Sequence, residues 1–431
     1  MLCIYKKMAS VDQSILFINN LSYQLPTPSS VVTNRVLKRA YFQNRNYASE
    51  NTMICQFNTG SDSVNTKNSK LVLKVKATVT DVTDSISDFG TGSGMNLVKN
   101  IRIYHRSGTT YTNTQKMNLF RAKVDHIKES STWFTSIGNP MMGYNKGIKF
   151  EKDNFTNTLE QYIEIPLDKL HPFFDPHGGC LLPNQIAAGL RVEIDLENPL
   201  TAFSKQVAPA PAGYVNGYTI EDCYFDLESY SLMDSAQASL NTTASTKSLE
   251  YLYTDIFTSQ NSQPSNTSQL NIDINKSVAL ADSVIGCIQP QANIIDGTVD
   301  TFATSYQAGS WWYMLGSNQY PLQKVDVSKS AYAQALLTFD KFSHPNNDSA
   351  LVYYDPAPAP DVGFIINNGV YAQSLERDTS LALSASPVNA SRSLRFELTY
   401  DAPPGSAQLF TIFLQYLSSS RSTLLNSRVD I

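Results

Sequence analysis

The chain has 431 residues and a formal net charge of −5, with 33 Lys and Arg residues against 38 Asp and Glu residues. This charge excludes nucleic-acid binding through bulk positive charge, and the length exceeds that of one small module. Charged residues make up only 16% of the chain, whereas aromatic residues make up 11%. Because Lys and Glu favour helices and aromatic residues favour strands, this composition predicts mainly β structure and excludes a mostly disordered chain.

The first 33 residues show no strong periodicity, and their apolar run at 15–18 is too short for the core of a signal peptide. No stretch of the chain reaches the roughly 18 apolar residues that a membrane helix needs. We therefore expect a soluble chain without a membrane span, and Met8 is an alternative start of translation. The cysteines form no CxxC pair, so we expect buried or unreactive thiols rather than a zinc site or a disulfide scaffold. The five are Cys3, Cys55, Cys180, Cys223 and Cys287.

Alternation of apolar and polar residues predicts strands at 70–79, 190–197 and 394–400. In the first of these, Leu71 and Leu73 share one face while Lys74 and Lys76 take the other. One buried and one solvated face is typical of antiparallel sheets rather than of a parallel α/β core. Other strand candidates are residues 100–105, 162–167, 223–232, 311–315, 363–367 and 409–417.

Helical spacing occurs in two segments, each a short distance after a strand that ends at a glycine. The first apolar stripe has Lys, Arg and Asp on the other faces, and its members are Met117, Phe120, Val124 and Ile127. The second stripe consists of Tyr332, Leu336 and Phe339. The glycines that precede the two helices are Gly108 and Gly316.

These matches suggest an internal repeat, because three kinds of element recur in the same order at nearly constant spacing. Gly316 follows Gly108 by 208 residues, and Leu394 in LRFEL follows Leu190 in LRVEI by 204 residues. We therefore expect a duplicated β-domain, with the boundary in the polar run at 234–248. Two loops rich in Pro and Ala, at 207–213 and 355–363, are expected to be exposed excursions.

Residues 171–180, HPFFDPHGGC, contain the only cluster of residue types that bind metals: His171, Asp175, His177 and Cys180. A metal site needs three or four such side chains converging on one point. Two prolines and a Gly-Gly pair predict a turn with solvent-facing imidazoles instead. His126 is expected to flank the apolar stripe of the first helix, and His105 and His344 are scattered.

No other motif predicts chemistry. FGTGSG at 89–94 resembles a phosphate-binding loop but matches neither GxGxxG nor GxxxxGK[ST], so we interpret it as a flexible turn. Basic and aromatic residues in NIRIYHRSG at 100–108 are too sparse for a nucleic-acid site. GxSxG and HExxH are absent, and Glu221 and Asp222 are expected on a solvated strand face rather than across a cleft. We assign no catalytic, cofactor-binding or metal-binding residue, and expect neither a cofactor nor enzyme activity.

One family fits three stretches of the sequence. Residues 165–197, IPLDKLHPFFDPHGGCLLPNQIAAGLRVEIDLE, resemble a recurrent stretch in the major capsid proteins of virophages and polinton-like viruses. LGSNQYPLQKVDVSKSAYAQAL at 315–336 is similar to the family's turn leading into a helix. LRFELTYDAPPGSAQLFTIFLQYL at 394–417 resembles its closing strands.

The resemblance implies an all-β double jelly roll, that is, two eight-stranded antiparallel β-sandwiches in tandem, each with a short helix, as in the adenovirus-hexon lineage of double-stranded DNA viruses. We accordingly divide the chain into an N-terminal arm (1–33), a first jelly roll (34–236) and a second jelly roll (237–431). By analogy, the arm would lie along the base of a capsid and clamp neighbouring capsomers, with the two Pro/Ala loops directed outward.

The implied function is that of a major capsid protein whose homotrimers form pseudo-hexagonal capsomers that tile an icosahedral shell. Its implied partners are further copies of itself, neighbouring capsomers, and separate penton and minor capsid proteins, with no sequence-specific nucleic acid. The implied location is the virion, assembled inside the infected cell. Two alternatives stay open: a minor, vertex or fibre-like structural β-protein without the duplication, and a carbohydrate-binding or carbohydrate-active β-sandwich.

Overall fold

The computed structural model describes fifteen ranges of the chain: 31–79, 86–90, 92–144, 148, 150–151, 158–177, 181–205, 215–246, 249–294, 301–302, 309–327, 330–339, 369–377, 385–422 and 429–430. Several sequence predictions lie outside these residues. They are the strand at 363–367, the loops at 207–213 and 355–363, and all but the last three residues of the N-terminal arm.

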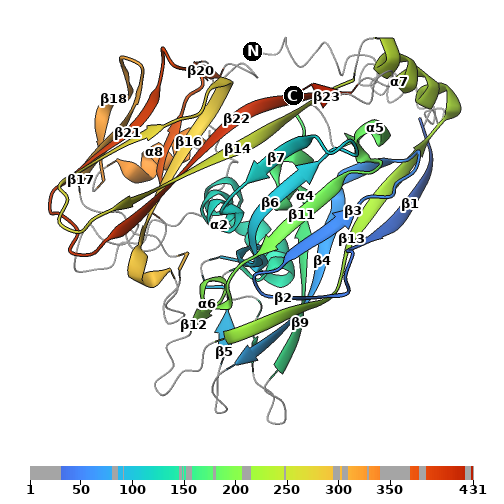
Figure 1. Cartoon of the computed structure of the whole chain (residues 1–431), viewed down its shortest axis with the longest axis horizontal. Coiled ribbons are helices and arrows are strands. Elements are labelled where there is room, and N and C mark those ends of the chain that lie inside the picture. The colour runs from blue at the N-terminus through green and yellow to red at the C-terminus, as the bar shows by residue number, and fades with distance from the viewer. Residues whose placement is uncertain are drawn as a thin grey trace, which may run out of the picture.

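The described residues form two β-sandwiches (Figure 1), each built from two larger antiparallel sheets. In the first sandwich, one sheet has the order β1-β13-β4-β10, with β9 also paired to β4 and β2 to β13. Its strands are β1 (Val32–Tyr41), β2 (Asn46–Ala48), β4 (Ser63–Val79), β9 (Thr158–Pro166), β10 (Leu181–Leu182) and β13 (Val215–Leu232). The facing sheet has the order β3-β11-β6-β7. Its strands are β3 (Thr52–Gln56), β6 (Val98–Tyr104), β7 (Thr110–Thr114) and β11 (Arg191–Leu196).

The second sandwich repeats this arrangement. One sheet has the order β14-β22-β16-β19, with β20 also paired to β16 and β23 to β22. Its strands are β14 (Leu249–Gln263), β16 (Val278–Pro290), β19 (Tyr371–Ser374), β20 (Ser386–Val388), β22 (Gln408–Ser422) and β23 (Val429–Asp430). The facing sheet has the order β15-β21-β17-β18. Its strands are β15 (Gln269–Ile274), β17 (Gly309–Leu315), β18 (Asn318–Asp326) and β21 (Leu394–Tyr400).

Strand order and register confirm the predicted repeat. Taken along the chain, β1, β3, β4, β6, β7, β9, β11 and β13 occupy the same places as β14, β15, β16, β17, β18, β19, β21 and β22. The correspondence extends to single pairs, because Arg191 of β11 lies opposite Tyr104 of β6, and Arg395 of β21 lies opposite Met314 of β17. Gly108 and Gly316 both have positive φ, at 88° and 62°, in the turn between the two strands of a hairpin. A residue with a Cβ is strained in that conformation, which is why glycine stands at both turns.

The strands predicted from alternation are present, most of them with somewhat different ends. The predicted strand at 394–400 coincides with β21, whereas the one at 70–79 is the second half of β4. Along β21 the apolar residues are buried and the residues between them are exposed or half-buried, as the alternation requires. A third, small sheet lies beside the first sandwich and was not predicted; it consists of β5 (Ile86–Asp88), β8 (Phe150–Glu151) and β12 (Ser204–Lys205).

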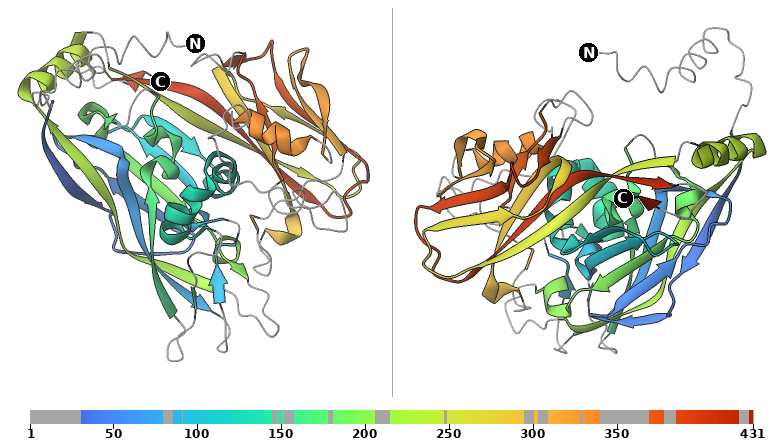
Figure 2. Two further views of the ribbon diagram at one scale, coloured as in Figure 1. Left: turned by 180° about the vertical axis from the view of Figure 1, so that it is seen from behind. Right: turned by 45° about the horizontal axis from the view of Figure 1, so that its top comes forward.

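Both predicted helices form, as α2 (Met117–Lys128) and α8 (Ala331–Thr338). The prediction of only two helices was wrong, because the polar run that was expected to be a boundary forms α7 (Asp234–Thr246). Thr242 and Thr243 donate hydrogen bonds to the carbonyls of Ala238 and Ser239 one turn earlier, so these polar side chains are satisfied within the helix. In both views of Figure 2, α7 lies at the end of the first sandwich remote from the second.

The other helical segments are short, and most lie in loops of the first sandwich. They are η1 (Gly94–Leu97), α3 (Ser131–Trp133), the π-helix η2 (Phe134–Met142), α4 (Leu167–Leu170), η4 (Pro172–Phe174), α5 (Asn184–Ala187), α6 (Pro199–Ala202) and η5 (Gln291–Asn293). In the described part of the chain, no helix is long and apolar enough to cross a bilayer. A single continuous cluster of buried apolar side chains runs through both sandwiches.

Candidate assembly surfaces

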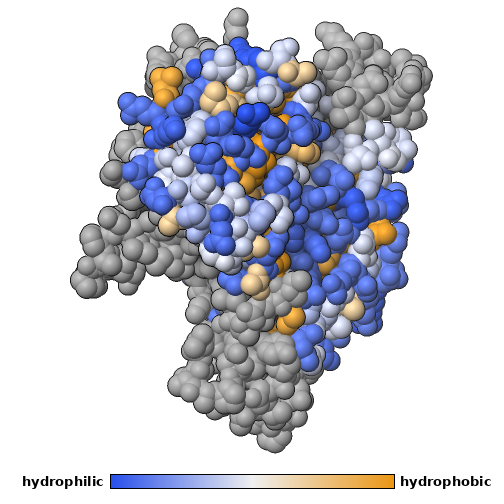
Figure 3. Space-filling model, turned by 60° about the vertical axis from the view of Figure 1, so that its left-hand side comes forward, coloured by the Kyte–Doolittle hydropathy of each residue, from blue (hydrophilic) through white to orange (hydrophobic). Residues whose placement is uncertain are grey.

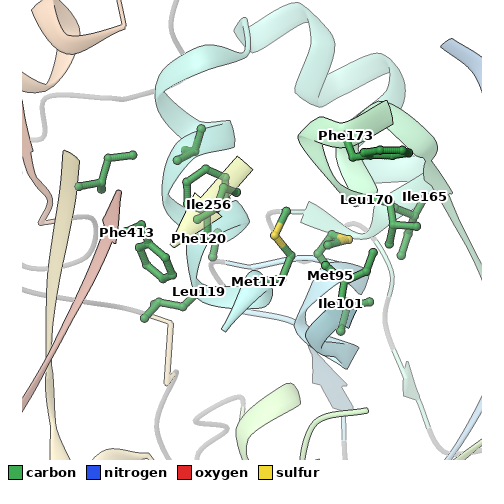
Figure 4. Packing of buried hydrophobic residues seen from close by; sticks show 14 of the residues in the cluster. Met95, Ile101, Met117, Leu119, Phe120, Ile165, Leu170, Phe173, Ile256 and Phe413 are labelled. Carbon is green, nitrogen blue, oxygen red and sulfur yellow. The ribbon is translucent and has the colours of Figure 1, made fainter. Parts of the chain in front are cut away.

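Helix α2 lies where the two sandwiches meet, and its side chains reach into both (Figure 4). Phe120 points to Phe413 of β22, with ring centroids 5.4 Å apart, while Met117 lies beside Met95 and Ile101 of the first sandwich. Eleven of the twelve residues of α2 are buried. The Lys, Arg and Asp residues that the sequence places between the members of the apolar stripe are therefore buried together with it.

The buried charged residues of α2 have partners. Arg121 donates to the main-chain oxygen of Asp168 at 2.7 Å and to the carboxylate of Asp125 at 3.3 Å. Asp125 also accepts a hydrogen bond from the Tyr144 hydroxyl at 2.6 Å, and burial holds the pKa of Tyr144 well above its usual range. Lys123 donates to the main-chain oxygen of Phe302, in the second half of the chain. Buried charges are tolerated in this way only when they are paired and hydrogen-bonded.

Strand β14 provides most of the polar contacts between the sandwiches. Figure 1 shows β14 and its neighbour β22 extending from the second sandwich across the first. The hydroxyls of Tyr251 and Tyr253 donate to the main-chain oxygens of Phe173 and Tyr111, at 2.6 and 2.9 Å. On the same face, the carboxylate of Asp255 accepts a hydrogen bond from Thr112 of β7. The N-terminal half of β14 is therefore built to cover β7 and η4 of the first sandwich.

Asp255 lies in a groove of about 710 Å³ between β7, β14 and β22. Its carboxylate also accepts hydrogen bonds from the Tyr416 hydroxyl at 2.6 Å and from the amide of Ile256 at 2.8 Å. Burial raises the pKa of Asp255, although these three donors oppose the rise. Lys276 lies over the rings of Phe257 and Tyr416, at 5.6 and 5.5 Å from their centroids. The carboxylate of Asp255 thus connects β14 and β22 of the second sandwich with β7 of the first.

The predicted metal-like cluster is not brought together. His171 is fully buried, which corrects the expectation of a solvent-facing imidazole, whereas Asp175 and His177 are exposed. His177 bonds to Thr254 of β14 at 3.0 Å, and Cys180 lies outside the described residues. Among the described residues, no three His, Cys, Asp or Glu side chains converge as a metal site requires.

His171 takes part in the junction between the sandwiches. Its Nδ1 accepts from the amide of Phe173 at 3.0 Å, so the proton of the neutral ring is on Nε2, which lies 2.9 Å from Thr114 Oγ1. Thr114 in turn donates to the main-chain oxygen of Ile256 in β14, at 3.3 Å. Burial, aided by the charge of Arg121, lowers the pKa of His171 to about 3. The sequence signal for this role was the apolar context of His171, between Leu170 and Phe173.

The glycine-rich segment at 89–94 was expected to be a flexible turn; it does turn, with the Gly92 amide donating to the main-chain oxygen of Phe89 at 3.1 Å, but the turn is buried. Its described residues are buried, and the Asn96 side chain donates to the main-chain oxygens of Phe89 and Ala202 at 3.0 and 3.1 Å. A Cβ on Gly92 would lie 1.9 Å from the Asn96 amide oxygen, so the space beside the glycine is filled by this side chain. The segment packs the core and leaves no room for a phosphate there.

The remaining polar and thiol candidates serve packing or pairing. Arg102 donates to Glu193 at 3.0 Å and to Asp195 at 2.7 Å, and Asp222 pairs with Arg45 at 2.5 Å. His105 and His126 are both buried. Burial raises the pKa of three cysteines to about 12, as expected for unreactive thiols; these are Cys55, Cys223 and Cys287.

Large apolar side chains are exposed on two edges of the molecule. On β1, Val36 is 38% exposed, Leu37 58% and Tyr41 64%. On the opposite side, Leu322 of β18 is 91% exposed and Leu337 of α8 is 49% exposed. Figure 3 shows the side of the molecule on which the second sandwich lies. Its surface is mainly hydrophilic, and the hydrophobic residues there form small separate patches. Exposed apolar edges of this kind mark surfaces that another chain can cover.

Comparison with known proteins agrees with this architecture. No protein-family model matches the chain, and a search of curated proteins found no similar sequence. Solved structures do match: the PBCV-1 virus capsid aligns over 95% of this chain and 98% of its own, at 12% identity and a TM-score of 0.61. A chain of the Sputnik virophage covers 94% of this chain and 90% of its own, at 9% identity and a TM-score of 0.59. The mavirus major capsid protein covers 95% and 93%, at 8% identity and 0.54.

The chain has the double jelly-roll fold. The expected all-β architecture of two eight-stranded sandwiches, each with a short helix, is therefore confirmed, and the short strands β2, β10, β20 and β23 are additions to the eight. At these identities the likeness to capsid proteins concerns the fold alone. Within the double jelly roll, the covered junction lies at β7, α2 and β14, and exposed apolar side chains lie on β1 and on β18 with α8.

Proposed function

We propose that this chain is a major capsid protein, a structural subunit of a virion rather than an enzyme. The observation that carries this proposal is the repeat of one eight-stranded sandwich, joined in tandem through a buried junction. Structures of viral capsid proteins that align with nearly the whole chain support the same role. A chain of this kind presents two similar lobes in a fixed relation to each other, which is the geometry that a shell subunit needs.

We further propose that three copies form a pseudo-hexagonal capsomer. Three chains with two similar sandwiches each give six comparable lobes around a three-fold axis, and such a particle tiles the faces of an icosahedron. Rings form when a head-to-tail contact closes by rotation. Neighbouring capsomers, a penton protein at the five-fold vertices and minor capsid proteins would be the further partners, in a shell assembled inside the infected cell. We also propose domain bounds of 1–33, 34–236 and 237–431.

The experiment that tests this proposal is a measurement of the solution mass, paired with negative-stain electron microscopy of the purified protein. A mass near three times 47.8 kDa together with hexagonal outlines is expected. A monomer of irregular outline at every accessible concentration would count against the capsomer and favour the two alternative functions, a minor structural protein or a carbohydrate-binding or carbohydrate-active protein.

The duplication argues against the vertex or fibre alternative, which would lack it. For the carbohydrate-active alternative, a hydrolase would place two carboxylates across a cleft. The groove between the sandwiches is lined by a single carboxylate, Asp255, whose oxygens already accept hydrogen bonds from Thr112 and Tyr416. Another pocket, of about 590 Å³, lies between the end of β1 and β13. It contains Asp222, which is paired with Arg45. Neither arrangement favours glycoside chemistry.

A further inference from the structure

The groove between the two sandwiches has the size and the position of a small-molecule site. Its volume is about 710 Å³, within the range of roughly 300–1,000 Å³ that such sites occupy, and sites of this kind often lie where two domains meet. Its lining comes from β7, β14, β22 and the turn between β15 and β16. All of these elements belong to one chain, so the form of the groove does not depend on the proposed capsomer.

Hydrogen bonds fix the floor of the groove. Asp255 is only 7% exposed at this floor. Its carboxylate accepts from the hydroxyls of Thr112 and Tyr416 and from the amide of Ile256. Because these donors already occupy the carboxylate oxygens, a ligand gains little by donating to Asp255. The carboxylate is therefore a rigid part of the floor, and a ligand is recognised by the rest of the lining.

Lys276 supplies the positive charge of the groove. Its ammonium lies 5.6 and 5.5 Å from the ring centroids of Phe257 and Tyr416. Within the described part of the chain Lys276 forms no salt bridge, whereas the half-buried Lys70 binds the carboxylate of Glu164 at 2.6 Å. An ammonium that rests on aromatic rings is held in place while its N–H groups stay available to an anion. Lys276 is thus positioned to bind a negatively charged group in the groove.

The rim of the groove is polar. Thr110, Asn113 and Gln115 are exposed along β7 and just after it. Ser277 is exposed in the turn next to Lys276. Their hydroxyl and amide groups can both donate and accept hydrogen bonds, as the hydroxyl groups of a sugar do. An apolar ligand would cover these groups without bonding to them, which costs free energy, so the lining favours a hydroxyl-rich ligand.

We propose that this groove binds a sugar ring that carries one carboxylate, that is, a uronic acid. The carboxylate pairs with the ammonium of Lys276, and the ring hydroxyls bond to the amides and hydroxyls of the rim. Among the described residues that line the groove, Lys276 is the one cation and Asp255 the one anion, so a singly charged ligand fits better than a phosphate with two charges. The site binds its ligand without cleaving it, because a hydrolase needs a second carboxylate. The inference goes beyond the proposed capsid role and gives each subunit a point of attachment to acidic polysaccharides.

Saturation-transfer NMR on the full chain tests the site, with methyl glucuronide and methyl glucoside as probes. The two sugars differ only at C6, where the first carries the carboxylate. The glucuronide is expected to bind about tenfold more tightly than the glucoside. Lys276→Gln removes the charge and is expected to abolish this preference. Lys324→Gln is the matched control, because Lys324 also lies over an aromatic ring, 3.8 Å from the centroid of Trp312, but outside the groove.

Equal binding of the two sugars, or a preference that survives Lys276→Gln, overturns the inference. Acetate that displaces the glucuronide at equal concentration also overturns it, since the carboxylate alone would then be recognised. Asn113→Ala removes a rim amide and is expected to weaken both sugars while keeping the preference; unchanged binding of both sugars would contradict the role of the rim. None of these results depends on the oligomeric state. A monomeric protein that binds the glucuronide therefore refutes the proposed capsomer alone, and a trimer that binds neither sugar refutes this inference alone.

Discussion

Helices α2 and α8 occupy the same place in the two sandwiches, yet their surroundings differ. Both follow a hairpin whose turn contains a glycine with positive φ. Helix α2 is enclosed, with Arg121, Lys123 and Asp125 buried in hydrogen-bonded pairs, whereas α8 leaves Leu337 exposed. The first sandwich provides the partners of Arg121 and Asp125. The second sandwich adds contacts to Phe120 and Lys123, and among the described residues α8 has no such neighbour over Leu337. The burial of α2 therefore depends on both sandwiches together.

The largest test of this comparison is Phe120→Ala. The ring is buried at the centre of the junction against Phe413, so its removal is expected to lower the free energy of unfolding by about 3–5 kcal/mol. Leu337→Ala on α8 is the matched control and is expected to cost within about 0.5 kcal/mol, because Leu337 is exposed. Urea denaturation of both variants measures the difference, and equal losses would show that the two helices are equally covered.

The second test concerns pH and the junction histidine. The folded pKa of His171, about 3, lies below its usual 6.5, so the unfolded chain binds the proton more tightly and stability falls as the pH drops between these values. The loss approaches about 1.4 kcal/mol per pH unit, or about 3 kcal/mol between pH 6.5 and 4. His171→Asn is expected to flatten this part of the stability curve, measured by urea denaturation across the range. An unchanged slope would mean that the folded and the unfolded chain bind the His171 proton equally tightly.

A smaller effect is expected from Tyr416→Phe, which removes one donor from Asp255 and is expected to cost about 1–2 kcal/mol. Burial raises the pKa of Asp255 above the unfolded value, so the folded state holds this proton more tightly and stability is lost as the pH rises through the folded pKa. Losing the Tyr416 donor raises the pKa of Asp255 further, so the variant should lose more free energy of unfolding at pH 7 than at pH 4.

Tyr400→Phe is the control for that measurement, because the Tyr400 hydroxyl donates to the neutral side chain of Gln263 within the second sandwich. Its cost should be independent of pH between 4 and 7. If both variants show the same pH dependence, Asp255 is not the group that responds.

The smallest expected effect on stability belongs to Leu322→Ser. This side chain is 91% exposed on β18, so the free energy of unfolding should change by no more than about 0.5 kcal/mol. The thermal midpoint, measured under dissociating conditions, should accordingly stay close to that of the wild type. Thr112→Ser is the comparison, because it changes a buried side chain on β7, the strand that corresponds to β18. A large loss for Leu322→Ser would indicate that β18 is covered within the monomer.

Local sequence patterns predicted much of the fold. Alternation located β21 and β11, helical spacing located α2 and α8, and the spacing of Gly108 and Gly316 revealed the repeat. Each of these signals depends on which face of an element packs against its own sandwich, which is information that a short stretch of sequence carries.

The junction could not be predicted in the same way. His171 and Lys123 are buried polar residues whose hydrogen-bond partners lie far along the chain: Thr114 for His171 and Phe302 for Lys123. Local pattern gives no sign of such partners, so the imidazole of His171 was expected in solvent. The segment at 89–94 was misjudged for a similar reason, since the Asn96 side chain that fixes it also bonds to Ala202, far along the chain.

Only two residues separate the end of α7 at Thr246 from the start of β14 at Leu249. This short connection tethers the second sandwich to the first, so the junction forms at an effective concentration that short linkers raise to the order of millimolar. A contact between separate chains has no such tether, so its extent depends on the concentration of the protein. The contact between the two sandwiches of one chain therefore forms at any concentration of the protein.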